Sequence, residues 1–437
     1  MTGADGTVKQ LLSLQGEQRI NVHAGDEAGF RQACGHGHGG IVELLLSLGG
    51  DRCIDVHADN EAAFRDACAN GHAAVVGMLL SLGGDRCIDV HADNEAGFRQ
   101  ACANGHVDVT QTLLALQGDR RVDVHNPFCG GVYTVARLGR GGVLELLLAL
   151  QGDRRMVAQD EVGDAFEAAC SEGHEGIVRQ LLSLDGDRRV NVHAGDEAAF
   201  FHACKEGHEG IVRVLLALEG DRRINVNADG DRAFIYACWG GHEGIVRMLL
   251  ALDGDRRVSG DTPGNSSLET ACKEGHQGIV ELLLSLDGDR RVTERVDEAF
   301  QGACRTGHEG IVRVLLSLDG DRSVDVHAQN EAAFRYACQM GHEGIVELLL
   351  ALEGDRRIGV QTRQGTALQL ACTLGHEGIV RMLLALEGDR QIDVQASLGD
   401  SFSSVCANGH EGVVRMLLGL EGDRRIDVHA GLGRYGS

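Results

Sequence analysis

The sequence predicts an all-α solenoid in which short helix-turn-helix units stack on one another and are joined by short extended finger connectors. The first observation is a Gly-His step that returns eleven times, mostly 34 residues apart. The second is that each step lies between two segments with helical apolar spacing. A fixed period in this range is typical of stacked repeats, in which each unit contacts only its neighbours. We expect one repeat array over residues 1–437, with a half-unit at 1–20, a degenerate unit at about 126–150, and a final helix and finger at about 411–437.

The first helix of a unit is predicted around Glu61–Ala69, where Phe64, Ala67 and Cys68 follow i, i+3, i+4 spacing. That spacing places them on one buried stripe. We expect Asp59 or Asn60 to cap the start of this helix and Gly71 to end it in the left-handed conformation.

The second helix is predicted at residues such as Gly344–Leu352, which are apolar on nearly every side. This composition is expected of a helix that is covered by a neighbour on both flanks. Gly354 is expected to end it, and a connector of alternating polar and β-type residues follows.

Three places depart from the pattern. In the degenerate unit, Val132, Ala136 and Arg140 stand where other units have Phe, Cys and His. The connector at 258–267 has its own sequence, and the connector at 292–300 is two residues shorter than the others. These departures either bend the stack locally, mark a functional site, or reflect neutral sequence variation in a loop that tolerates change.

Residues 363–384, RQGTALQLACTLGHEGIVRMLL, resemble the ankyrin repeat. Gly365-Thr366-Ala367-Leu368 stands at that family's Gly-x-Thr-Pro-Leu helix start, and Gly375-His376 stands at its turn. The resemblance covers about twelve units, although most replace the Thr-Pro start with Glu-Ala-Ala or Glu-Ala-Gly. It implies L-shaped units of two antiparallel helices with a projecting finger. It also implies a concave side, formed by first helices and fingertips, that binds other proteins.

Charge and composition restrict the possible partners. The formal charge is −24, which disfavours unspecific contact with nucleic acid or anionic lipid. The longest apolar runs fall far short of the ~20 residues that span a bilayer, and the first residues do not resemble a signal peptide. We expect a cytoplasmic protein in a reducing compartment, with no membrane contact.

Eleven of the 14 cysteines occupy one repeat position, where buried free thiols are expected. Adjacent units are ~10 Å apart, beyond the ~7 Å that a disulfide can bridge. We expect greater exposure for the others, which are Cys53, Cys87 and Cys129.

The pair Cys338 and His342 offers only two of the four ligands that zinc requires, as do His36 and His38. We therefore expect no metal and no cofactor. The His of each Gly-His step is expected to bond the backbone of its own turn and to cap the second helix.

Two polar ladders recur along the connectors. The finger histidines are expected to be solvated, with a pH-sensitive partner surface as the alternative. The Asp-Arg-Arg steps are expected to form ion pairs between units, with a phosphate-binding stripe as the alternative. Phosphate-loop, nucleophile-elbow and zinc-helix motifs are absent from the sequence, so we expect no enzyme.

The expected partner-binding residues are unusually large or polar side chains beside the Ala-Cys pair. Exposed Trp and Tyr are favoured at interaction hot spots, and the alternative is that these residues fill gaps between adjacent first helices. They are Phe201, His202, Ile235, Tyr236, Trp239, Tyr336, Gln339 and Met340.

We therefore expect a non-catalytic scaffold that binds a protein partner through its concave face. The alternative is an assembly component that stacks with itself or within a larger complex. That alternative is motivated by the last helix, Val413–Leu420, which is apolar where a polar terminal cap is usual. Nucleic-acid binding through the arginine ladder is the least favoured hypothesis.

Overall fold

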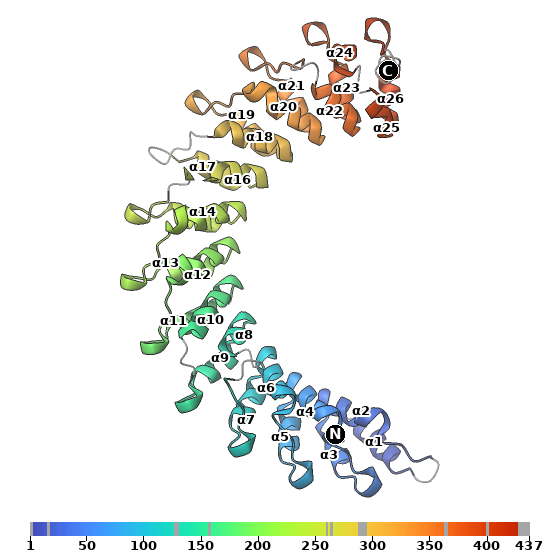
Figure 1. Cartoon of the computed structure of the whole chain (residues 1–437), viewed down its shortest axis with the longest axis vertical. Coiled ribbons are helices and arrows are strands. Elements are labelled where there is room, and N and C mark those ends of the chain that lie inside the picture. Colours follow the sequence, from blue (N-terminus) through green and yellow to red (C-terminus); the bar gives the residue numbers. More distant parts are fainter. Residues whose placement is uncertain are drawn as a thin grey trace, which may run out of the picture. The chain divides into compact units, whose positions relative to one another are not determined.

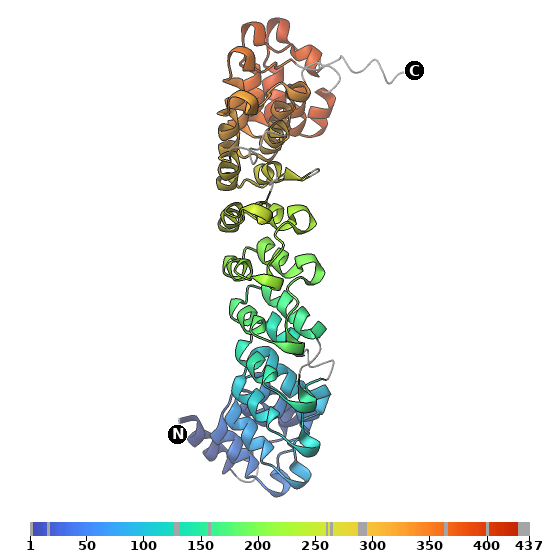
Figure 2. The same ribbon diagram turned by 90° about the vertical axis from the view of Figure 1, so that its left-hand side faces the viewer.

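The computed structural model describes residues 3–14, 18–125, 131–155, 159–258, 261–262, 265–286, 295–361, 366–398 and 402–426. Chain contacts divide it into an N-terminal part, Met1–Asn225, and a C-terminal part, Val226–Ser437. Within each part, helix pairs follow one another in chain order (Figures 1 and 2). The predicted all-α repeat architecture is confirmed.

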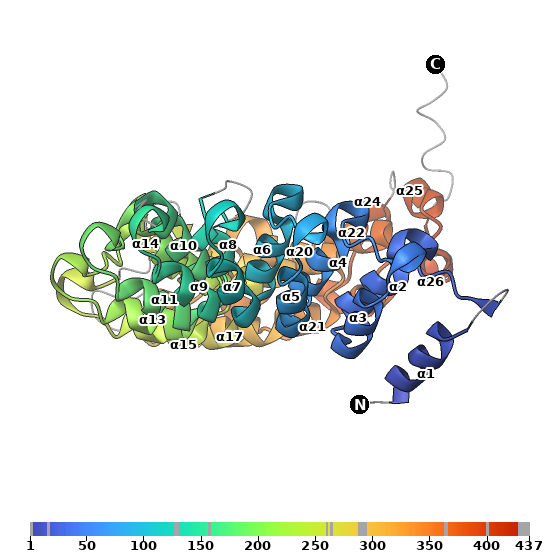
Figure 3. The same ribbon diagram turned by 90° about the horizontal axis from the view of Figure 1, so that it is seen from below.

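The N-terminal part alternates first and second helices, beginning with a lone second helix, α1 (Gly3–Leu12), which is visible with α2 and α3 in Figure 3. The first helices are α2 (Ala24–Gly35), α4 (Ala58–Ala69), α6 (Ala92–Asn104), α8 (Gly131–Arg137), α10 (Gln159–Ser171) and α12 (Ala194–Lys205). The second helices are α3 (Gly39–Leu46), α5 (Ala73–Leu80), α7 (Val107–Leu114), α9 (Gly141–Leu148), α11 (Glu175–Leu182) and α13 (Glu209–Leu216).

The C-terminal part repeats this order. Its first helices are α14 (Ala228–Trp239), α16 (Ser267–Glu274), α18 (Val296–Thr306), α20 (Ala328–Met340), α22 (Thr366–Leu374) and α25 (Phe402–Ala407). Its second helices are α15 (Glu243–Leu250), α17 (Gln277–Leu284), α19 (Glu309–Leu316), α21 (Glu343–Leu350), α23 (Glu377–Leu384) and α26 (Glu411–Leu418), and a short helix α24 (Val394–Leu398) precedes α25.

Most described connectors contain a 3-10 turn at their Gly-Asp-Arg step, a feature that the sequence pattern did not reveal. At Gly354–Arg356, for example, the glycine has φ +61° and opens this turn, whereas α21 already ends at Leu350. Gly354 therefore does not end the helix, as had been expected. The connector between α15 and α16 contains this turn, at Gly254–Arg256, and also a two-residue antiparallel ladder between β1 (Asp261–Thr262) and β2 (Asn265–Ser266).

The start of the first helix differs from the prediction. In α4, Asp59, Asn60 and Glu61 all have positive φ (51°, 56° and 62°), and no side chain caps the helix. Each left-handed L-residue costs roughly 1–2 kcal/mol, so this turn needs support. The support is the buried Glu61 carboxylate, which accepts from Nδ1 of His57 (2.6 Å) and from the N–H of Asp89 in the next connector (3.1 Å).

The core of each helix pair contains the apolar stripe that was predicted for the first helix. Phe64 and Cys68 are 1% and 0% exposed, and Gly71 has φ +79° as expected. In the degenerate unit, Val132 and Ala136 are also fully buried, at 1% and 0%. Its helix pair therefore persists with smaller core residues.

Candidate partner-binding surface

In most units the histidine of the Gly-His step joins two successive helix pairs. Nε2 of His106 donates to the carbonyl of Ala69, the last residue of the preceding first helix, at 2.8 Å. The same bond, at 2.8–3.0 Å, is made by His72, His174, His208, His276, His308, His342, His376 and His410. These side chains make no capping bond to their own helix, so the expected bond to their own turn is wrong.

The glycine of the step is required by the same contact. A Cβ on Gly71 would lie 2.4 Å from Nδ1 of His106 in the next pair. The glycine therefore supplies both the left-handed turn and the space for the incoming ring.

The degenerate unit keeps this bond with a different side chain. Nε of Arg140 donates to the carbonyl of Ala103 at 2.8 Å, and its Cδ lies over Gly105. The shortened connector also preserves the ladder, because His308 reaches the carbonyl of Lys273 at 3.0 Å. Neither departure interrupts the stack.

The two arginines of the Asp-Arg-Arg step have different roles. The first caps the second helix of the preceding unit: Nη1 of Arg188 donates to the carbonyl of Leu148, the last residue of α9, at 2.8 Å. A guanidinium at this position satisfies an unpaired terminal carbonyl and interacts favourably with the helix dipole.

The second arginine forms the predicted ion pair with the Asp of the next step. Arg189 binds both carboxylate oxygens of Asp221, at 2.6 and 2.8 Å. The pairing lowers the pKa of Asp221. The expected pairing between units is confirmed at Arg19–Asp51, Arg121–Asp153, Arg155–Asp187, Arg189–Asp221 and Arg357–Asp389.

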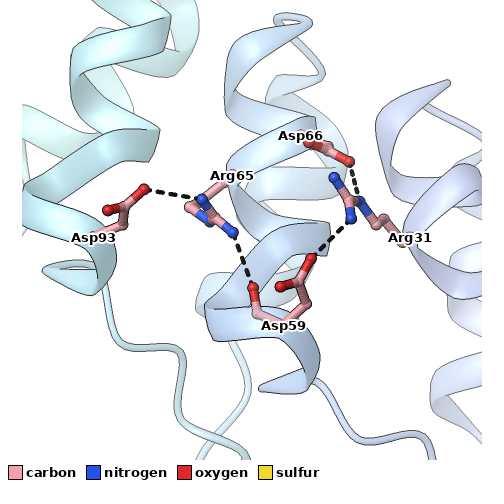
Figure 4. Close-up of polar contacts among 5 residues, drawn as sticks. All are labelled: Arg31, Asp59, Arg65, Asp66 and Asp93. Atoms are coloured by element: carbon pink, nitrogen blue, oxygen red, sulfur yellow. Dashed lines mark hydrogen bonds and ion pairs between the residues drawn. The ribbon is translucent and has the colours of Figure 1, made fainter. Parts of the chain in front are cut away.

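Further ion pairs link the first helices α2, α4 and α6 (Figure 4). Arg31 binds Asp59 at 2.9 Å and Asp66 at 2.6 Å, and Arg65 binds Asp93 at 3.1 Å. These five charged side chains are therefore paired within the array.

The finger histidines are bonded as well as solvated. The ring of His57 is placed between the Glu61 carboxylate and the carbonyl of Asp85 in the next connector, at 2.6 and 2.8 Å. Hydrogen bonding first to Glu61 and then to that carbonyl raises the pKa of His57. The expectation of a merely solvated fingertip is therefore wrong for this ring. His429, the last of the finger histidines in the sequence, lies outside the described residues.

The cysteines are free and mostly buried. Burial raises the pKa of the Cys34 thiol to about 12 and raises that of Cys338 still further above its usual value. A protonated buried thiol is a poor nucleophile and a poor metal ligand. Cys53 and Cys87 are exposed as predicted. Cys129 lies outside the described residues.

Cys406 corrects the expectation that all eleven repeat cysteines are buried, because it is exposed. It belongs to α25, the last first helix in the described chain, and none of the later described residues forms a further first helix to cover it. Across the described ranges, no three His, Cys, Asp or Glu side chains lie close enough together to hold a metal ion.

Two predicted contact residues lie in the N-terminal part, and one of them is unavailable to a partner. Phe201 is only 9% exposed and packs edge-on against His202, with ring centroids 5.1 Å apart. His202 is half-buried, with Nε2 3.3 Å from a carboxylate oxygen of Glu167. The burial of Phe201 agrees with the alternative role of a packing residue.

Three predicted residues lie on α14. Trp239 is 48% exposed, whereas Ile235 and Tyr236 are half-buried. The rings of Tyr236 and Trp239 form an edge-to-face pair with centroids 6.1 Å apart, and the Arg232 guanidinium lies 5.8 Å from the centre of the Tyr236 ring.

The other three residues lie on α20, where Met340 is 53% exposed and Tyr336 and Gln339 are half-buried. Tyr336 and Met340 are four residues apart, so they share one side of the helix.

The neighbouring α22 carries two apolar residues that the sequence reasoning missed. Leu370 is half-buried and Leu374 is 46% exposed. Relative to the repeat cysteine, they occupy the same positions as Tyr336 and Met340, and α20 and α22 pack together. Aligning each unit on its cysteine would have found them. We refer to these four residues as the α20–α22 patch: Tyr336, Met340, Leu370 and Leu374.

Residues 166–258, 218–296 and 268–358 each match a family model described as ankyrin repeats. No curated protein matches the chain. No helix in the part of the chain that the structure describes combines the length and the apolar character needed to cross a membrane.

Proposed function

Because this chain is an ankyrin-repeat protein, and such repeats are generally protein–protein interaction modules, we propose that it is a scaffold that binds a protein partner. The contact would be the first-helix side of the C-terminal part, which the family resemblance identifies as the concave face. The α20–α22 patch would be its centre.

The observation that carries this proposal is the contrast between matched polar groups and exposed apolar ones. On α2, α4 and α6 the arginines Arg31 and Arg65 pair with aspartates of the next first helix. Two residues after the repeat cysteine, α4 and α6 have Asn70 and Asn104, whose side chains donate to carbonyls of the preceding first helix at 2.9 and 2.7 Å. On α20 and α22 that position holds Met340 and Leu374, about half of whose surface is open to water. Burying a Leu or Met side chain fully is worth about 1.5–3 kcal/mol, so this unused surface is a source of binding free energy.

The same contrast favours a non-catalytic role, which is typical of the family. The recurring Cys and His residues, the best candidates for chemistry, are occupied in packing and in bonds between pairs. His342 donates to the carbonyl of Arg305 at 3.0 Å, and Cys338 is fully buried. A thiolate–imidazole pair therefore does not form there.

The test is quantitative affinity capture from the native source with wild type, Leu374→Glu and Leu418→Glu as baits. Leu418 is a matched control because it is at least as exposed as Leu374 (56% against 46%) but lies on the second helix α26. Leu374→Glu would bury a charge in the contact, so we expect at least tenfold lower recovery, a loss of about 1.4 kcal/mol or more. Leu418→Glu should retain wild-type recovery.

Equal recovery by all three baits would refute the assignment of the patch. Thermal denaturation of each bait provides the folding control. Since Leu374 is exposed, we expect Tm values within about 2 °C, as for surface substitutions worth less than about 0.5 kcal/mol.

A further inference from the structure

A cleft lies between the first helix α10 and the next unit, at the point where α12 and the connector before it face α10. Its volume is about 440 Å³, and Gly163, Phe166, Asn191 and Ala199 are among its lining residues. Phe166 and Ala199 are buried, at 2% and 5% exposure, whereas Asn191 is exposed. The cleft therefore has an apolar wall beside the polar backbone of a connector.

Other units place an acidic side chain against the connector at this point. The residue seven positions before the repeat cysteine accepts a hydrogen bond from a backbone N–H of the next connector, at 2.8–3.1 Å. These acceptor–donor pairs are Glu27–Asp55, Glu61–Asp89, Glu95–Asp123, Glu197–Asn225 and Asp297–Asp325.

The unit of α10 lacks this acidic side chain, because Gly163 stands seven positions before Cys170. Asn191 is the equivalent of Asp89 and Asn225, and within the described ranges no acceptor bonds to its N–H. A Cβ on Gly163 would meet nothing within 4 Å, so there is room for an acceptor. The array has a donor and a space here, but it does not supply the acceptor itself.

The helix α18 shows which side chain would reach this N–H from α10. Val162-Gly163 on α10 and Val296-Asp297 on α18 are equivalent, and neither Gly163 nor Asp297 has the positive φ that is found at Glu61. The short side chain of Asp297 still meets the N–H of its connector at 2.8 Å. A residue of this length at position 163 would therefore fill the cleft, whereas the glycine leaves it open to an external group.

The rim of the cleft carries carboxylates rather than cations. Asp164 and Glu167 line it, and no Arg, Lys or His is among its described lining residues. Glu167 stands where α4 has Arg65, whose guanidinium binds Asp93 of the next first helix (Figure 4). Glu167 instead lies 3.3 Å from Nε2 of His202. A further carboxylate in the cleft would be disfavoured, because like charges at this distance repel.

These groups restrict the ligand. It must accept a hydrogen bond from the Asn191 N–H and donate one to a rim carboxylate without carrying a negative charge itself. Lys and Arg only donate and ionised carboxylates only accept, whereas a carboxamide accepts through its oxygen and donates through its nitrogen. Glutamine also has the shape of the glutamate that occupies this position in most other units.

We propose that the cleft between α10 and α12 binds a glutamine side chain of a partner protein. The carbonyl oxygen of that side chain accepts from the Asn191 N–H, and its NH₂ group donates to Asp164 or Glu167. Its methylene groups contact Phe166 and Ala199.

The probe is N-acetyl-L-glutamine methylamide, titrated into the full chain labelled with nitrogen-15 asparagine. The amide signal of Asn191, assigned by its loss in Asn191→Asp, reports on the cleft. We expect saturable shifts of this signal with a Kd of about 1–10 mM, as for other ligands of this size. The glutamate and arginine analogues of the probe should bind at least fivefold more weakly.

Gly163→Asn is the variant that fills the cleft, because asparagine has the size of the Asp297 side chain. It should weaken probe binding at least tenfold and slow hydrogen exchange at the Asn191 amide at least threefold. Gly176→Asn is the matched control: it adds the same side chain to α11, where a Cβ would also meet nothing within 4 Å, and it should change neither quantity. The signals of the other asparagines show whether each variant is folded.

The proposal would be overturned by the absence of a saturable shift at Asn191, by tighter binding of the glutamate or arginine analogue, or by equal probe binding to Gly163→Asn. Faster exchange at the Asn191 amide in Gly163→Asn would also overturn it. The choice of a protein ligand rests on the proposed function, but the cleft shares no residue with the α20–α22 patch. The Leu374→Glu chain should bind the probe normally, so failure here is distinguishable from failure of the proposed function.

Discussion

Gly71→Ala tests the contact between the Gly-His step and the next helix pair. Gly71 has φ +79°, and a Cβ there would lie 2.4 Å from Nδ1 of His106 and 2.7 Å from its Cε1. Carbon contacts are favourable at about 3.5–4.0 Å, so the ring must move by about 1 Å. Its 2.8 Å bond to the carbonyl of Ala69 would then be lost.

Two costs in stability add in the Gly71→Ala variant. An Ala in the left-handed region costs roughly 1–2 kcal/mol, and losing the histidine bond costs about 1 kcal/mol more. Gly84→Ala is the matched control, because Gly84 has φ +64° but nothing within 4 Å of its Cβ position. The expected difference between the two variants is therefore about 1 kcal/mol, or about fivefold in a local opening constant.

The assay is native-state hydrogen exchange, which reports local opening in an array that need not unfold in two states. In a His106→Ala background, the cost of Gly71→Ala should fall to that of Gly84→Ala. Equal costs for the two glycines in the wild-type background, or no change on removing the His106 ring, would refute the contact as a stabilising element.

Three further outcomes are expected. Because the pKa of His57 is raised in the folded chain, its stabilising contribution is complete below the unfolded value of about 6.5 and is lost as pH rises through the folded pKa. Exchange at the Asp89 amide, corrected for intrinsic rate, should thus quicken from pH 6 to pH 8 in wild type and change less in His57→Asn. A flat wild-type profile would contradict this. Arg140→Ala should destabilise its neighbourhood by about 1 kcal/mol and Arg140→His should restore most of it, and equal exchange profiles for the two variants would argue against the bond to Ala103. In the native protein, iodoacetamide should modify the exposed thiols first, and rapid modification of buried Cys238 would contradict the core assignment; among described residues the exposed thiols are Cys53, Cys87 and Cys406.

Periodicity was sufficient to predict the fold, because each unit buries apolar side chains at the same repeat positions. The Phe64 and Cys68 stripe, the left-handed Gly71 and the Arg189–Asp221 ion pair all follow from spacing and charge within one or two repeats.

The contacts between pairs were harder to predict, because they join residues 28 to 40 positions apart through backbone groups. The carbonyl of Ala69 carries no signature in the sequence, so His106 was assigned to its own turn. The left-handed turn at Asp59 was missed for a similar reason: it depends on a buried carboxylate, Glu61, whose partners come from another connector.

The exposure of the candidate contact residues was predicted only in part. Unusual residue types identified Trp239 and Met340, which are exposed, but also Phe201, which is buried. Leu374 was missed because leucine is common throughout the chain, and its exposure depends on its position relative to the repeat cysteine. An unusually large side chain therefore shows that a position differs from its equivalents in other units. Alignment on the repeat cysteine shows on which side of the helix that position lies.

Hydroxyl-radical footprinting of the complex with the captured partner tests the central claim most directly. Met340 is 53% exposed and carries a readily oxidised thioether. Its oxidation rate therefore shows whether the partner covers this side chain. The account predicts that Met340 and Leu374 become at least fivefold less reactive in the complex, while Leu418 keeps its rate. Unchanged oxidation of Met340 and Leu374 in a saturated complex would contradict binding through the α20–α22 patch.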